Sequence, residues 1–137
     1  MKIMTNVSEL PERERMKIAQ SVDTSVETLK ELAKDEDWGV RRADAENPKT
    51  PEETLSTLSH DVVLWVRAAA ASNENTSLKD LSNLSKDKNG FVRWKVTQNP
   101  KTPIEILTEL ENDSDESVKE EAHKHKNELI ATRQNHS

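Results

Sequence analysis

A repeat of 26 residues constrains the fold of this chain more than any other feature of its sequence. Residues 26 positions apart form columns of the same or similar type. Each unit has a valine, a basic residue directly after it, in most units an asparagine seven positions after the valine, and an aspartate near its end. These columns are Val40, Val66, Val92 and Val118; Arg41, Arg67, Arg93 and Lys119; Asn47, Asn73 and Asn99; Asp61, Asp87 and Asp113. A weaker copy with Arg15 and Asp35 precedes them. Such self-similarity predicts a protein in which each unit packs on its neighbours.

Two helices are predicted in each unit. The second begins at a threonine: Thr50 suits an N-cap, Pro51 suits the first helical position, and Glu53 completes a capping box. Leucines three positions apart follow, a spacing that fits the buried stripe of a helix. The first helix centres on the valine, is rich in alanine at 68–71, and ends at Asn-Pro pairs such as 47–48.

The expected architecture is all-α: a short α-solenoid of about four 26-residue, two-helix repeats with degenerate capping ends. We place one solenoid domain at residues 1–125 and a polar, frayed tail at 126–137. Apolar residues make up only 32% of the chain and charged residues 34%, a composition that also suits disorder, but their regular placement argues against it. The repeats fall near 14–39, 40–65, 66–91 and 92–117, and the degenerate cap begins at 118–125.

The pattern Val-Arg-x-x-(Ala/Val)-(Ala/Thr)-x-Asn-Pro-x-Thr-Pro, followed by two leucines and an aspartate, resembles the leucine-rich repeat variant family. Residues 40–61 and 92–113 carry it well, whereas 66–87 lacks both prolines and the flanking copies are degenerate. The step from the aspartate to the next Val-Arg pair also resembles HEAT-type repeats. The resemblance implies a HEAT-like helical solenoid that alternates an α-helix with a shorter 3₁₀-type helix and offers a binding surface rather than a reaction. Some members carry an N-terminal iron–sulfur module, which a chain without cysteine cannot hold.

Composition and charge weigh against several functions. The net charge of −6 disfavours tight non-specific binding to nucleic acid, although it leaves room for a local basic strip. The absence of cysteine excludes disulfides, thiolate metal sites and cysteine nucleophiles. No apolar run approaches the roughly 20 residues that span a membrane, and residues 1–10 lack the apolar core of a signal peptide. We therefore expect a cytoplasmic protein without a membrane partner and without a cofactor.

Histidines and carboxylates form no pattern typical of a metal site or a catalytic centre. His123 and His125 are two positions apart and so point to different faces of a helix, while His60 and His136 stand alone. One acid is unusual, because Asp44 stands in an otherwise apolar column. The other members are Ile18, Ala70, Val96 and Ala122. Asp44 could serve a small HEAT-like nucleobase glycosylase, but we favour a salt-bridged residue at the edge of the fold.

The recurring basic column has two interpretations. Each arginine could pair with an aspartate of its own or the adjacent unit, forming a ladder that holds the repeats in register. Alternatively, Arg41, Arg67 and Arg93 form a basic stripe along one face. We favour the ladder, because a residue that recurs in every unit usually serves the unit itself.

Departures from the repeat give a sharper functional signal. Trp94 shares its column with residues that a core position would not accept, so we predict that Trp94 is exposed; the alternative is that it covers a hydrophobic layer. That column also holds Met16, Arg42, Ala68 and Glu120. Lys95 breaks a column of alanines, and with Arg93 and Trp94 it is predicted to form a cation–aromatic patch.

The other aromatic residues are assigned to structure. Trp65 and Phe91 share one column and are predicted to lie in the core, whereas Trp38 is expected to pack at the start of a helix.

The leading functional hypothesis is a non-enzymatic module that holds a protein or peptide on one solenoid face. Its candidate contact residues are Arg41, Arg42, Arg67, Arg93, Trp94 and Lys95. Nucleic-acid binding through the same residues is the alternative, and the net charge disfavours it. A third possibility is a structural building block whose end layers self-associate, which the polar C-terminal segment argues against at that end.

Overall fold

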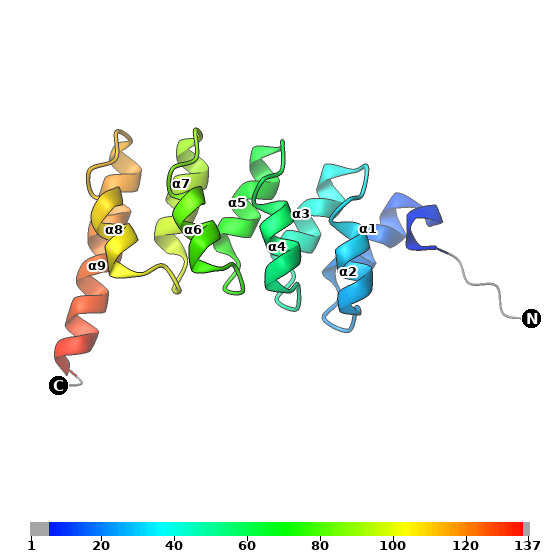
Figure 1. Ribbon diagram of the computed structural model, residues 1–137, viewed down its shortest axis with the longest axis horizontal. Helices are drawn as coiled ribbons and strands as arrows, with labels where there is room; N and C mark the ends of the chain where they lie inside the picture. The colour runs from blue at the N-terminus through cyan, green and yellow to red at the C-terminus, as the bar shows by residue number, and fades with distance from the viewer. Residues whose placement is uncertain (1–5, 136–137) are drawn as a thin grey trace, which may run out of the picture.

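The computed structural model describes residues 6–135, and every regular element in this range is helical (Figure 1). A short 3₁₀ helix, η1 (Val7–Glu9), precedes a series of α-helices. These are α1 (Glu12–Gln20), α2 (Val26–Leu32), α3 (Trp38–Glu46), α4 (Glu52–Leu58), α5 (Leu64–Ser72), α6 (Leu78–Leu84), α7 (Gly90–Gln98), α8 (Ile104–Leu110) and α9 (Glu116–Asn135). The predicted all-α fold is confirmed.

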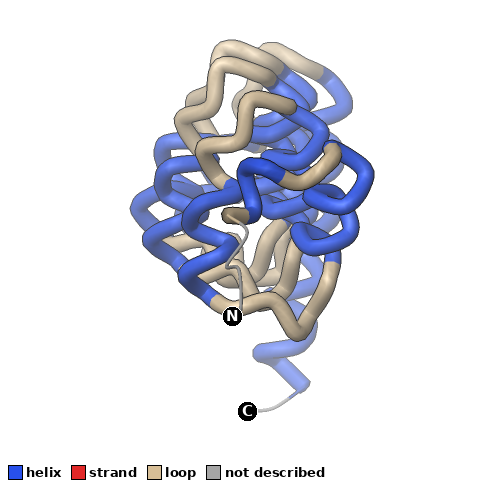
Figure 2. The backbone as a smooth tube through the Cα atoms, turned by 90° about the vertical axis from the view of Figure 1, so that its right-hand side faces the viewer, coloured by secondary structure: helices blue, strands red, loops and turns tan. Residues whose placement is uncertain are grey.

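The helices form a stack of two layers. The first helices of the units, α1, α3, α5, α7 and α9, pack directly on one another, and we call them the first-helix layer. The second helices, α2, α4, α6 and α8, lie in front of that layer in Figure 1. Each of α2, α4 and α6 contacts the first helix of its own unit and of the next, and α8 packs on α9. Viewed from the N-terminal end, successive units overlap along one axis (Figure 2). Units of two helices repeated in this way build the predicted short solenoid.

The second helix of each unit is an α-helix of seven residues, whereas the family resemblance implied a 3₁₀-type helix. In α4, for example, the Leu55 N–H donates to the Pro51 carbonyl four residues earlier, at 3.0 Å. Seven residues leave room for such i→i−4 bonds, which define the α-helix.

The threonine column has a different role from the N-cap that the sequence suggested. The N-caps are one residue later, at Ser25, Pro51, Ser77 and Pro103. The threonine hydroxyl instead donates to a carbonyl six residues earlier, as from Thr50 to Asp44 at 2.6 Å and from Thr102 to Val96 at 2.7 Å. Each threonine therefore ties the end of a first helix to the start of the second. Its hydroxyl gives the carbonyl a second hydrogen bond beside that from the C-cap N–H, which for Asp44 comes from Asn47 at 3.1 Å.

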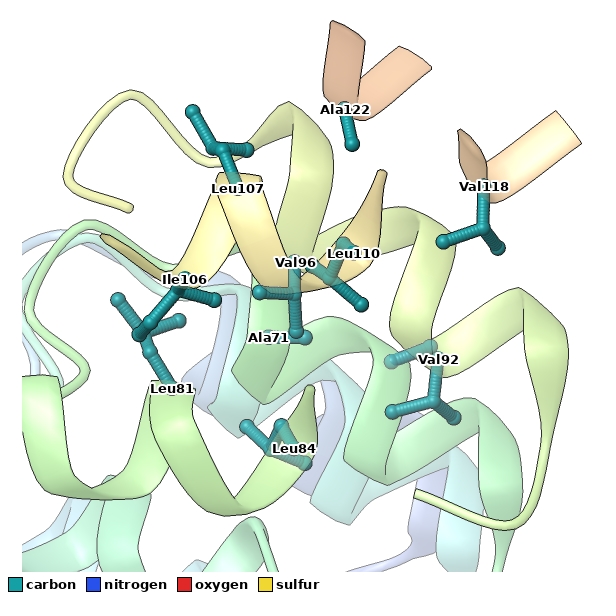
Figure 3. Packing of buried hydrophobic residues seen from close by; sticks show 11 residues of the cluster. Ala71, Leu81, Leu84, Val92, Val96, Ile106, Leu107, Leu110, Val118 and Ala122 are labelled. Carbon is teal, nitrogen blue, oxygen red and sulfur yellow. The ribbon is translucent and has the colours of Figure 1, made fainter. Parts of the chain in front are cut away.

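The core lies between the two layers and is built from the leucine, valine and alanine columns. Figure 3 shows its C-terminal part, where side chains from α6 to α9 meet the alanine side of α5. Leu81, Leu107 and Val92 are completely buried there. Each such side chain stabilises the fold by about 1.5–3 kcal/mol relative to exposure. The core is thus a row of similar layers, which a chain of modest hydrophobicity can fill.

The arginine column forms the predicted ladder. Arg67 donates from Nε and Nη2 to the carboxylate of Asp87, 20 residues later, at 2.8 and 3.1 Å. Its Nη1 donates to the carbonyl of Asp61 in the preceding unit at 2.9 Å. Arg15, Arg41 and Arg93 make the same bidentate pair with Asp35, Asp61 and Asp113. Because one guanidinium holds both its own unit and the one before it, the ladder fixes the register between repeats.

A second ladder runs through the asparagine column. The amide of Asn73 donates to two buried carbonyls of the preceding unit, those of Ala45 at 2.8 Å and Asn47 at 3.0 Å. His125 stands 26 positions after Asn99, and its Nδ1 lies 2.7 Å from the Thr97 carbonyl, the equivalent acceptor. In the last unit, the imidazole of His125 therefore takes the place of the asparagine amide, and Nδ1 is the nitrogen that carries the proton.

The predicted frayed tail at 126–137 is wrong for residues 126–135, which continue α9 to Asn135; 136–137, like 1–5, lie outside the described residues. Lys126 forms an ion pair with Glu111 at 2.9 Å, and Leu129 packs against the core of the last units. Polar composition alone suggested fraying, but these contacts back to α8 and the core hold the helix.

Candidate binding surface on the first helices

The six residues predicted to contact a partner divide into two groups. Arg41, Arg67 and Arg93 belong to the ladder, and their side chains are only 14%, 9% and 14% exposed. Each guanidinium already holds a carboxylate and a carbonyl, so these three arginines do not form the predicted stripe. Arg42, Trp94 and Lys95 instead lie along shallow depressions on α3 and α7.

Three aromatic side chains from α5 and α7 contact one another at the surface. The ring centroids of Trp65 and Phe91 are 5.3 Å apart in an edge-to-face arrangement, and Phe91 stacks on Trp94 at 5.9 Å. Trp65 is 43% and Phe91 39% exposed, so the prediction that both belong to the core is wrong. Their column also holds Gly39 and Ser117. Such small residues do not build a core layer, and this was the signal in the sequence that pointed to the surface.

Trp94 is half-buried, so both interpretations of this residue are partly correct. Its side chain packs against the hydrophobic cluster that α5 to α9 share. It also stacks with Phe91 and borders a depression of ≈ 380 Å³. Trp38, at the first position of α3 as expected, is 43% exposed.

Lys95 places a positive charge on the aromatic cluster. Its Nζ lies 5.5 Å from the centroid of Phe91 and 5.5 Å from that of Trp94. A cation at this distance from a ring face is attracted by the ring quadrupole. We call Trp65, Phe91, Trp94 and Lys95 the aromatic surface.

A depression of ≈ 300 Å³ lies beside the aromatic surface. Its shape follows from side-chain size, because α5 contributes the small Ala68, Ala69 and Ser72 between larger residues of its neighbours. Arg42 and Glu46 of α3 form the opposite wall and are ion-paired at 3.0 Å, with side chains about half exposed. The depression therefore has an apolar floor, an aromatic wall and a charged wall, as in sites that hold a side chain of a partner.

Asp44 is neither salt-bridged nor at an edge, contrary to the interpretation we favoured. Its side chain is 0% exposed, Oδ1 accepts from the Thr50 hydroxyl at 3.1 Å, and Oδ2 has no hydrogen-bond partner. Burial raises the pKa of Asp44 to about 7. A fully covered carboxyl acts on the stability of the fold and does not meet a ligand from solvent.

The described histidines are engaged with neighbouring groups. His60 Nδ1 lies 2.9 Å from the Ser56 carbonyl, and His123 Nδ1 lies 2.7 Å from the Glu111 carboxylate; His136 lies outside the described residues. Between residues 6 and 135, no three or more His, Cys, Asp or Glu side chains are grouped so that they could hold a metal ion. None of the helices in this same range has the length and apolar content that crossing a membrane requires.

Comparison with models of protein families, with curated proteins and with solved structures finds no match to this chain. The resemblance to the leucine-rich repeat variant family therefore stays a prediction from the repeat pattern. The case for function rests on the geometry of the aromatic surface.

Proposed function

We propose that this chain is a non-enzymatic binding module that holds another protein through the aromatic surface. The observation that carries the proposal is the contact between Trp65, Phe91 and Trp94, with the first two rings about 40% exposed (43% and 39%). Exposing contiguous aromatic area costs solubility, and such patches mark interaction sites. Tryptophan is also enriched among the residues that dominate binding energy at protein interfaces.

The fold supports this role because a solenoid offers an extended face on a rigid support. The aromatic surface lies on α5 and α7, near the middle of the first-helix layer, where packing on both sides holds the helices in place. A rigid site loses little conformational entropy when a partner binds. The depression of ≈ 300 Å³ between the aromatic and charged walls would take an apolar side chain of the partner.

Single-stranded nucleic acid is the second candidate, favoured by one observation. Lys95 sits over two stacked rings, and such a set could stack a base and bind a phosphate. The net charge of −6 opposes this candidate.

The test uses Phe91→Ser, since the same column holds Ser117 and the fold therefore accepts serine there. The matched control is Leu78→Ser, which removes an apolar side chain 60% exposed on the second-helix layer. We expect wild type and the control to retain the same proteins from a cell extract, and Phe91→Ser to lose them. Equal retention by all three would contradict the proposal. Binding of single-stranded DNA that needs Phe91 and falls steeply with salt would favour the second candidate.

A further inference from the structure

On the outer face of the first-helix layer, the repeat columns that pass through the aromatic surface are basic at one end of the stack and acidic at the other. At the N-terminal end, Arg13 and Lys17 of α1 are exposed. At the C-terminal end, Glu120 and Glu121 occupy the same part of α9. Lys17 and Glu121 belong to one repeat column, which passes through Ala43, Ala69 and Lys95. The aromatic surface lies between these two ends. The face therefore changes from basic, through aromatic, to acidic along the stack.

We propose that this face binds the same face of a second copy of the chain, with the two stacks antiparallel. The proposal rests on the proposed function, because it makes the second copy the protein that the aromatic surface holds. A two-fold axis parallel to the helices at α5 places α1 opposite α9 of the second copy and α3 opposite its α7. Such an isologous contact is the commonest way in which proteins form dimers.

Because the repeat has a constant period, each residue on this face lies opposite a residue of the same column in the second copy, with the order of the units reversed. Lys17 faces Glu121 of the second copy, which pairs opposite charges at both ends of the interface. Arg42 faces Trp94, which brings a guanidinium to an aromatic ring, an attractive arrangement when solvent is displaced.

Side-chain size is complementary along the same face. Gly39 faces Phe91 of the second copy, and because glycine has no side chain, the ring meets the Met16 and Asp37 side chains that border this position. At the centre α5 meets itself, and Ala68 and Ala69 leave space beside the two Trp65 rings. Large residues on α7 and small residues on α3 and α5 are what an antiparallel pair requires. A parallel pair would place α7 on α7 of the second copy, so that the large side chains of one copy meet those of the other.

The experiment is sedimentation velocity of the wild-type chain over a wide range of concentrations. We expect the mass to rise from 15.6 kDa to twice that value as concentration increases. Lys17→Glu and Glu121→Lys should each weaken the dimer about tenfold, because each reversal turns attraction into repulsion at two symmetry-related contacts. The double variant, Lys17→Glu with Glu121→Lys, should regain the wild-type dissociation constant. Circular dichroism checks that each variant is folded.

Leu78→Asp is the control, because it adds a charge at an exposed position of the other layer and should leave the dimer unchanged. A wild-type chain that stays at 15.6 kDa throughout would overturn the proposal. So would a dimer that ignores the single reversals, or one that the double variant does not restore. If the chain is monomeric but Phe91→Ser still loses proteins from the extract, only this proposal fails and the aromatic surface serves a different protein.

Discussion

Replacing Asp44 with alanine should stabilise the fold at neutral and alkaline pH. Burial raises the pKa of this carboxyl from 3.8 to about 7, so the folded chain holds the proton more tightly than the unfolded chain does. The stability that this proton contributes is fully present below pH 3.8 and is lost as the pH rises to about 7. A shift of about 3 units, at about 1.4 kcal/mol each, lowers the free energy of unfolding by about 4 kcal/mol above that pH.

Alanine suits the site, since Ala70 fills the same column one unit later and is fully buried. Urea unfolding of both proteins, followed by tryptophan fluorescence, gives the difference in free energy of unfolding at each pH. We expect this difference to grow from near zero at about pH 4 to about 4 kcal/mol at about pH 8. The melting temperature at the higher pH should rise by on the order of 10 °C.

Comparing two proteins at each pH removes the effect of other acids. The pKa of Glu111 is lowered by hydrogen bonds from His123 and Lys126, so its contribution falls with acid in wild type and variant alike. Asp44→Asn, which keeps the volume but never ionises, should also abolish the pH-dependent step. A difference that does not change with pH, or an alanine variant less stable than wild type at about pH 8, would refute the reasoning.

Three further predictions concern the ladders. Arg67→Ala should lower the free energy of unfolding by about 3 kcal/mol in urea, because Asp87 is left as a nearly buried charge without its partner. Asn73→Ala should cost about 2 kcal/mol in the same assay, since the buried Ala45 carbonyl loses the Asn73 donor and the Asn47 carbonyl keeps only the Thr50 N–H. His125→Asn should leave hydrogen exchange in α9 unchanged, whereas His125→Ala should accelerate it, because only the asparagine can replace the bond to Thr97.

The fold was predictable because the residues that build it recur in every unit. The valine and leucine columns predicted the buried stripes of the helices, and the two columns of opposite charge predicted the pairing of arginine with aspartate. Even the role of His125 was present as a position in the asparagine column. The sequence did not indicate which backbone group each polar side chain would bind. The threonines therefore seemed to be caps, although their hydroxyls donate back to the first helix.

The candidate site was harder to predict because two consecutive units share an aromatic residue. Trp65 and Phe91 look like a core column when only those units are compared, and only the wider column, with Gly39 and Ser117, marks a surface position. Asp44 shows the opposite difficulty. Its column is apolar and its position is buried. The sequence nevertheless suggested a position at the edge of the fold, because burying an unpaired carboxyl costs free energy and is therefore unexpected.

Departures from the repeat in a buried column, such as Asp44, and in an outer column, such as Phe91, differ in how much they change the free energy of unfolding. The ladders use the arginine, aspartate, threonine and asparagine columns, which leaves the outer columns free to vary. One outer column holds Arg13, Gly39, Trp65, Phe91 and Ser117, while the helices keep equivalent positions in every unit. The fold therefore does not require a ring at Phe91, so the serine variant should still fold, at a cost of about 1–3 kcal/mol for the lost contacts with Trp65 and Trp94. Circular dichroism and urea unfolding check that the variant is folded, and binding lost by a folded Phe91→Ser then reports on the aromatic surface and not on unfolding.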